Sequence, residues 1–187
     1  MLAALAATRD FPTDLKPAEG QHHLTRLLVF ANHVEELPAG CYAYNSAEHR
    51  LSAVGAPRPV AAFLQQSYSL LNYDLGQVAA VVAIAGRPAS VFARFGNRGL
   101  RVLNAEAGAV AQVGYLTAAA LGLGCGAVLG FDNRAMNEVL ELSGTDERTL
   151  LFLLFGAERA GLAAVGSVLV PGPVSPRSEP HTAGCTS

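Results

Sequence analysis

The chain contains no tryptophan, few cysteines and no excess of either charge, with 13 basic and 15 acidic side chains among its 187 residues. Its cysteines, Cys41, Cys125 and Cys185, are far apart and form no Cys-x-x-Cys pair. The sequence therefore supports neither a disulfide framework nor a zinc site, and we expect no bound metal and a reducing, cytoplasmic location. No basic run is interleaved with aromatic residues, so we expect no nucleic-acid partner.

Apolar runs of membrane length are also missing. The apolar residues 1–7 are followed by Arg9 and Asp10, which leaves this stretch too short for a signal sequence or a membrane span. We therefore expect no membrane partner. A hydrophobic content of 51% over this length is enough for one domain with a substantial core.

Proline and glycine mark the two ends of the expected domain. They punctuate the opening residues, so we expect a flexible leader over residues 1–16, followed by one domain over residues 17–170. Residues 171–187 contain proline, serine and glycine without apolar periodicity, and we expect this tail to be disordered.

The apolar pattern between these ends predicts an α+β order of elements. Continuous apolar runs predict buried strands, and 3.6-residue spacing predicts helices. The expected strands are residues 27–31 with a hairpin partner at 41–44, then 78–85 and 150–155, with a short extended piece at 127–129. The expected helices are residues 60–71, 101–121, and a segment that starts at the N-cap Asp132 and runs through Leu142.

A glycine-rich run at residues 122–126 could indicate a dinucleotide-binding turn. That fingerprint requires a preceding strand and a following helix. Here the long helix precedes the glycines and an extended piece follows, so we favour a helix C-cap with close packing.

The histidines give no sign of a catalytic or metal site. His22, His23 and His33 have no further ligand at metal-binding spacing, so we interpret them as loop residues. No serine, cysteine or lysine lies in a recognisable nucleophile elbow, which leaves hydrolase chemistry without support.

A series of short motifs is more specific. Residues 94–101 are Arg-Phe-Gly-Asn-Arg-Gly-Leu-Arg, followed by Glu106-Ala107-Gly108, Gln112, Leu-Gly-Leu-Gly at 121–124 and Gly-Phe-Asp at 130–132. In this order and spacing they resemble the signature of the SagB/McbC-type azoline dehydrogenases, FMN-dependent enzymes within the nitroreductase-like flavoproteins. Residues 17–23 and 34–42 resemble two upstream motifs of the same family, so the likeness covers residues 17–156.

The resemblance implies an antiparallel sheet flanked by helices and a dimer with FMN at the subunit interface. It implies that Leu129 and Gly130 lie against the reactive flavin nitrogen, that Gly20 belongs to the upstream flavin-binding motif, and that Arg159 is a candidate phosphate ligand. Glycine suits such positions because no Cβ separates the backbone amides from the flavin.

Three departures from the family pattern lie at the expected site. The opening Arg-Arg-Ser-x-Arg phosphate clamp would lie well before Pro17, and we expect it to be missing. The Lys-Tyr catalytic pair falls on Arg94 and Phe95, which can neither deprotonate usefully nor donate from a hydroxyl. The motif serine is Ala18 and a motif histidine is Ala109.

Two further arginines remain open in role. Arg98 and Arg101 could hold a phosphate or substrate, or could pair with Glu106 or water.

Two functions follow from the resemblance. The first is an FMN-dependent oxidoreductase that oxidises an azoline to an azole in a ribosomal or carrier-bound peptide. The second is a non-catalytic partner that completes or scaffolds a full-length dehydrogenase or a cyclodehydratase complex. Either function implies a peptide substrate and a homodimer or a heterodimer with a related subunit.

Overall fold

A single antiparallel sheet forms the centre of the protein. The computed structural model describes residues 1–12, 23–55 and 59–157. The sheet has six strands in the order β3-β2-β1-β4-β6-β5, and every neighbouring pair is antiparallel. The strands are β1 (Thr25–Ala31), β2 (Gly40–Asn45), β3 (Arg50–Ala53), β4 (Ala80–Gly86), β5 (Leu123–Val128) and β6 (Arg148–Ala157). This confirms the expected fold class and excludes a parallel dinucleotide-binding sheet.

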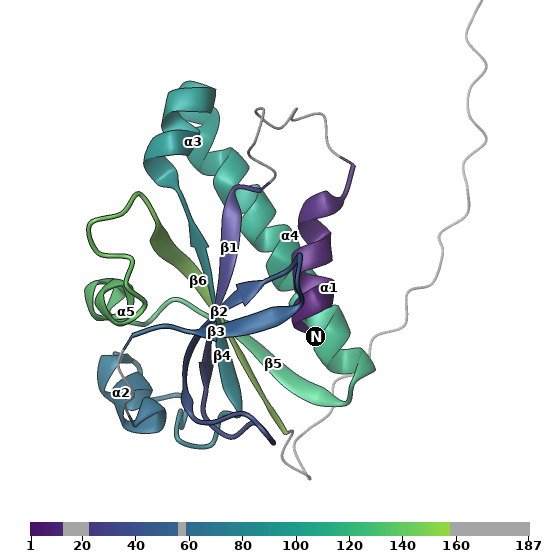
Figure 1. Cartoon of the computed structure of the whole chain (residues 1–187), viewed down its shortest axis with the longest axis vertical. Coiled ribbons are helices and arrows are strands. Elements are labelled where there is room, and N and C mark those ends of the chain that lie inside the picture. The colour runs from purple at the N-terminus through teal and green to yellow at the C-terminus, as the bar shows by residue number, and fades with distance from the viewer. Residues whose placement is uncertain (13–22, 56–58, 158–187) are drawn as a thin grey trace, which may run out of the picture.

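Helices cover both faces of this sheet (Figure 1). α1 (Leu2–Ala7) and α4 (Gly99–Ala120) pack on one face, and α2 (Val60–Ser67) and α5 (Asn133–Val139) pack on the other. α3 (Pro88–Phe95) follows β4 and is joined to α4 by the 3-10 turn η2 (Gly96–Arg98), and a second 3-10 turn, η1 (Thr8–Asp10), follows α1. The result is a three-layer α+β architecture.

The two central strands alternate between the two cores. In β1, Leu28 and Phe30 pack towards α2 and α5, while Leu27 and Val29 pack towards α1 and α4. All seven residues of β4 are buried. This agrees with the sequence prediction of a strand covered on both faces, and such a strand needs a continuous apolar run.

α4 lies close to the sheet because small residues line its buried side. A Cβ on Gly114 would lie 2.8 Å from Leu153 Cδ1, so a larger residue there would push the helix away from β6. A Cβ on Gly99 would lie 2.8 Å from the carbonyl oxygen of Val91, which shows how closely α4 approaches α3. Gly99, within the motif at residues 94–101, therefore has a packing role.

The N-terminal segment differs from the flexible leader expected over residues 1–16. Residues 2–10 form α1 and η1, and Leu5 is fully buried against α4. The Arg9 guanidinium donates to the carbonyl oxygens of Ala6 and Thr25, at 3.1 and 2.9 Å. Burial of the apolar side of a short helix, together with these bonds, orders the first twelve residues; residues 13–16 lie outside the described residues.

Two other boundaries differ from the sequence prediction. α2 ends at Ser67, four residues before the expected end at residue 71, because the chain beyond it pairs with the segment after β5. The run of glycines at 122–126 belongs mostly to β5, and only Gly122, with φ +67°, caps α4.

The described residues contain no helix with the length and apolar character needed to cross a membrane. Within the same residues, no group of three or more His, Cys, Asp or Glu side chains is placed to hold a metal ion.

Candidate functional site

The turn that leaves the end of β5 is the centre of the candidate site. Val128 is buried at the end of the strand, whereas Leu129 is 70% exposed. Phe131 is buried again, and the Asp132 carboxylate accepts hydrogen bonds from the amides of Arg134 and Ala135, at 2.9 and 3.2 Å. Asp132 is thus the N-cap of α5, as predicted. The exposed turn lies between two anchored elements.

The segment after α2 holds this turn from the other side. The amide and the hydroxyl of Ser69 both donate to the carbonyl oxygen of Gly130, at 2.8 and 2.7 Å. The amide of Asp132 donates to the carbonyl oxygen of Ser67 at 2.8 Å, and Tyr68 and Phe131 form an isolated antiparallel bridge. Residues 67–69 therefore act as a short strand paired with residues 130–132.

Only glycine fits at position 130 in this arrangement. A Cβ there would lie 2.8 Å from Tyr68 Cε2 and 3.3 Å from Leu70 Cδ1. The Tyr68 ring is 5% exposed, and its centroid lies 5.0 Å from that of Phe131, so it has little room to move. Burial raises the pKa of the Tyr68 phenol, which keeps it protonated as a donor to Asn72 Oδ1 at 3.0 Å.

The backbone amides of the turn are the chemically distinctive groups. Neither the Leu129 amide nor the Gly130 amide donates a hydrogen bond to any residue within the described ranges. The polar edge of a flavin offers nitrogen and oxygen acceptors to such amides. A fixed turn with two available donors therefore fits FMN, in the place that the sequence resemblance assigned to Leu129 and Gly130.

Exposed apolar side chains occur on the same two segments. Leu71 is 97% exposed, Leu70 is half exposed and Tyr73 is partly exposed, all within the loop that follows α2. A Cβ on Gly126 would lie 3.3 Å from the Tyr73 hydroxyl, so this loop reaches β5 as well as the turn. An apolar ring system placed at the turn could contact these side chains.

Arg94 and Phe95 lie on a different element, at the C-terminal end of α3. The Arg94 guanidinium lies over the Phe95 ring, with Cζ 4.6 Å from the ring centroid. Gly96, with φ +56°, ends the helix behind them. The two side chains thus contact each other, and neither carries a group that exchanges protons near neutral pH.

The remaining predicted residues are placed as follows. The Glu106 carboxylate binds the start of β1, with the Thr25 amide and hydroxyl as donors. Gly20 and Arg159 lie outside the described residues, so their roles stay predictions.

Sequence reasoning missed Tyr68 and Ser69, because residues 60–71 were assigned to one helix. One local feature indicates that the helix ends early: the turn-forming residues Asn72 and Asp74 follow Tyr68 and Ser69 within five residues.

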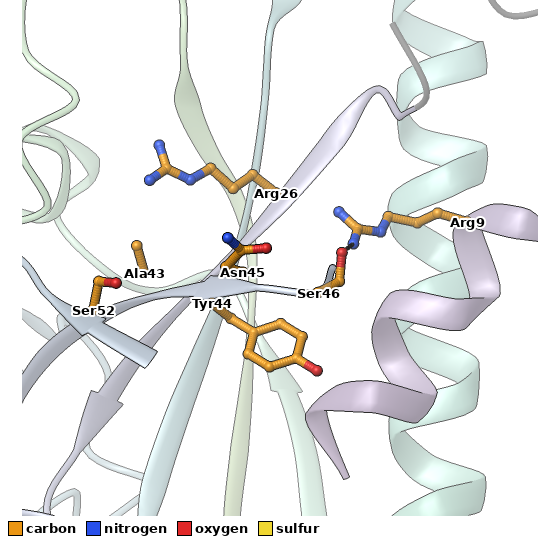
Figure 2. A pocket seen from close by; sticks show the side chains of 7 residues that line it. All are labelled: Arg9, Arg26, Ala43, Tyr44, Asn45, Ser46 and Ser52. Atoms are coloured by element: carbon orange, nitrogen blue, oxygen red, sulfur yellow. Dashed lines mark hydrogen bonds between the residues drawn. The ribbon is translucent and has the colours of Figure 1, made fainter. Parts of the chain in front are cut away.

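A polar pocket of about 390 Å³ lies near β2 and β3, towards the edge of the sheet opposite β5 (Figure 2). It is lined by Arg9, Arg26, Ala43, Tyr44, Asn45, Ser46 and Ser52. Burial lowers the pKa of Arg9, against the opposing effect of the Glu106 and Asp10 charges. The Arg9 guanidinium also donates to Ser46 Oγ at 3.2 Å, and that of Arg26 donates to Glu147 at 2.9 Å. Both arginines are thus engaged in bonds within the chain, and the turn after β5 remains the candidate functional site.

The comparisons with known proteins agree with this fold. The model of the nitroreductase family matches residues 3–157 of the chain. No curated protein matches it. The structure of a protein assigned as a nitroreductase from Anabaena variabilis is 30% identical, with a TM-score of 0.62, and the alignment covers 73% of this chain and 27% of that one.

Two more solved structures show the same fold at lower identity. One is the Escherichia coli microcin synthetase McbBCD complex with truncated pro-MccB17 bound, at 18% identity and a TM-score of 0.66, covering 84% of this chain and 63% of that chain. The other, assigned as a nitroreductase from Ralstonia eutropha, is 19% identical with a TM-score of 0.61, covering 85% and 72%. The present chain thus spans about a quarter of the Anabaena protein and less than two thirds of the microcin synthetase chain.

Proposed function

Because the chain belongs to the nitroreductase family, we propose that it is an FMN-dependent oxidoreductase of the azoline dehydrogenase type. The reaction would remove a hydride and a proton from a thiazoline or oxazoline in a peptide and leave the aromatic azole. One observation carries the proposal: the Leu129 and Gly130 amides have no described acceptor, and they lie in a turn fixed by Ser69.

The cofactor would supply the hydride acceptor when bound. The chain's own contribution at the turn is to donate hydrogen bonds from the two amides to the flavin edge. The exposed side chains of Leu70 and Leu71 would contact the apolar ring or the substrate and exclude water.

The proton that leaves the azoline also needs an acceptor. Arg94 remains protonated at working pH and Phe95 has no acidic or basic group, so neither can accept it. We therefore propose that the base comes from another residue of this chain or from a partner subunit.

A peptide substrate and a partner subunit are part of the proposal. The motif resemblance at residues 94–132 supports both. A chain of the McbBCD complex, which holds truncated pro-MccB17, has the same fold. With FMN at a subunit interface, a homodimer or a heterodimer with a related dehydrogenase subunit would complete the cradle.

A second candidate is favoured by the contact between Arg94 and Phe95. Their mutual cation–π contact occupies the position of the catalytic pair with groups that cannot perform acid–base chemistry. This favours a non-catalytic subunit that supplies half of a flavin cradle, or a peptide-holding surface, to a full-length relative.

The deciding experiment combines flavin binding with turnover. We would purify the protein alone and with a full-length relative, record the flavin absorption spectrum, and add FMN and a peptide that contains one thiazoline. An active enzyme binds FMN and converts the thiazoline to a thiazole, seen by mass spectrometry as the loss of two hydrogens. Turnover only in the presence of the relative, at sites traced to that relative, would support the non-catalytic reading. Absence of FMN binding in both preparations would contradict the oxidoreductase proposal.

A further inference from the structure

The Ser69 hydroxyl is the group from which a new role follows. We propose that Ser69 is a positioning residue for FMN: its hydroxyl restrains the Gly130 carbonyl and thereby narrows the backbone conformations open to Gly130, the residue whose amide, with that of Leu129, would face the flavin edge. The inference rests on the proposed function and assigns to it a residue outside the family motifs described above.

The geometry separates the hydroxyl from the backbone. The Ser69 amide donates to the Gly130 carbonyl oxygen at 2.8 Å, and a residue of almost any type could form that bond. The Ser69 hydroxyl adds a second donor to the same oxygen at 2.7 Å, and only serine or threonine could do so. Two donors on one carbonyl restrict the rotation of the peptide plane that follows Gly130.

The loop that carries Ser69 is itself fixed at several points. The Tyr68 hydroxyl donates to Asn72 Oδ1 at 3.0 Å. The Leu75 amide donates to Gln65 Oε1 at 2.9 Å, which ties the end of the loop back to α2. These bonds hold the loop in place, so the Ser69 hydroxyl is well positioned to restrain the Gly130 carbonyl.

Ser69 contributes little to the core. Its residue is exposed, so its replacement removes no apolar packing. A merely structural role would lower the stability by up to one net hydrogen bond and leave flavin binding almost unchanged. A positioning role would weaken flavin binding in addition, because the backbone at Gly130 would lose a restraint.

The expected loss follows from the strength of one hydrogen bond. Removing the hydroxyl should weaken FMN binding roughly 2- to 10-fold, the equivalent of one net hydrogen bond. Threonine keeps the hydroxyl, and the exposed position has room for its methyl group, so Ser69→Thr should restore binding.

The test uses Ser69→Ala, Ser69→Thr and the matched control Ser52→Ala. Ser52 is exposed on β3, and its hydroxyl makes no hydrogen bond to a described residue. FMN dissociation constants would be measured by flavin fluorescence titration, with the absorption maximum of the bound flavin and the thermal midpoint recorded for each variant. The proposal predicts weaker FMN binding and a shifted flavin absorption band in Ser69→Ala only, with a cofactor-free thermal midpoint lowered by no more than the loss of one hydrogen bond explains.

Other outcomes overturn it in distinguishable ways. Equal FMN affinity of Ser69→Ala and the wild type would overturn the role of Ser69 and leave the proposed function intact. Weaker binding in Ser69→Thr as well as Ser69→Ala would show that the hydroxyl is not the group responsible. Failure of the wild type to bind FMN, alone or with a full-length relative, would overturn the proposed function together with the role of Ser69.

Discussion

The Glu106 carboxylate on α4 accepts hydrogen bonds from both the amide and the hydroxyl of Thr25 at the start of β1, at 2.9 and 2.7 Å. The amide of Leu24 donates to the same carboxylate at 3.1 Å. One acidic side chain thus fastens the long helix to the beginning of a central strand. The Glu-Ala-Gly motif, found first as a family feature, has this structural role in the chain.

Replacement of Glu106 by alanine should lower the free energy of unfolding by about 2–3 kcal/mol, because the charge-assisted hydrogen bonds to a buried threonine disappear. Glu106→Gln keeps one oxygen acceptor and should lose less. Urea unfolding followed by circular dichroism measures both. Glu138→Ala on the exposed side of α5 is the control and should change stability by no more than about 0.5 kcal/mol. Equal losses in the Glu106 and Glu138 variants would contradict this role.

Two glycine-to-alanine changes should have opposite effects. Gly130→Ala should destabilise the protein by about 1–3 kcal/mol, because the new methyl group would overlap the confined Tyr68 ring. Gly108→Ala should stabilise it by about 0.5–1 kcal/mol, since an added Cβ in that helical position meets nothing within 4 Å. Thermal unfolding of the two variants shows whether each substitution raises or lowers the stability. A stable Gly130→Ala protein would mean that Tyr68 can move away.

Cys125 should react slowly with alkylating reagents in the folded protein. Burial raises the pKa of its thiol above that of the unfolded chain, and only the thiolate reacts. The neutral thiol thus favours the folded state below the unfolded pKa of about 8.5, and this contribution is lost as the pH rises through the higher folded pKa. Iodoacetamide labelling of a Cys185→Ser variant across this pH range, folded and in urea, tests the sign. The double variant Cys125→Ser/Cys185→Ser reports the background from Cys41. Superimposable folded and unfolded profiles would disprove the shift.

We expect Arg159 to determine whether the chain binds FMN in the absence of a partner subunit. If an internal arginine replaces the family's opening phosphate clamp, Arg159→Ala should weaken FMN binding at least tenfold, because a decrease of about 1.4 kcal/mol in binding free energy lowers the affinity by that factor. Fluorescence titration of the released flavin measures the change. An unaltered affinity would place the phosphate ligand on a partner subunit, or show that our account of the phosphate site is wrong. Arg134→Ala, on the exposed side of α5, serves as the charge-matched control.

We expect the chain to dimerise through α4 and to bury well over about 1,000 Å² in total. The helix buries one side against the sheet and leaves Leu116, 60% exposed, and Leu121, 57% exposed, on the outside. Leu116→Lys should shift the protein towards the monomer in sedimentation velocity experiments at micromolar concentration. Val34→Lys, in the turn after β1 and 37% exposed, is the matched apolar control. A wild-type monomer at these concentrations would contradict the expectation.

The sequence predicted the elements whose pattern is local. The apolar run at residues 78–85 and the long helix at 101–121 correspond to β4 and α4, because burial on two faces and helical period are visible within each segment. For the end of α2 the only local signal is the pair of turn-forming residues Asn72 and Asp74, and this pair does not specify that the helix ends at Ser67. Residues 67–69 leave the helix to pair with residues 130–132, and a pairing between segments so far apart in the chain has no local signature.

For the candidate site, too, the sequence indicates the residues of a local motif but not the residues that contact them from elsewhere in the chain. Leu129 and Gly130 follow from a motif; their amides donate to no described residue, and their role towards a flavin stays a prediction. Ser69 and Tyr68, which hold them, are specified only by tertiary contacts. The order of residues 2–10 was missed for a similar reason, since the burial of Leu5 depends on α4, which lies far along the chain.

The contact between Tyr115 and β5 bears on how the protein avoids association with other chains. Among the described residues β5 lies at one edge of the sheet, and its outward amides could pair with a strand from another molecule. The Tyr115 hydroxyl accepts the Ala127 amide at 2.7 Å and so occupies one of these pairing positions. A strand that approached this edge would have to displace a phenol held by the long helix. Tyr115 thus makes pairing between this edge and the edge strand of another molecule less favourable.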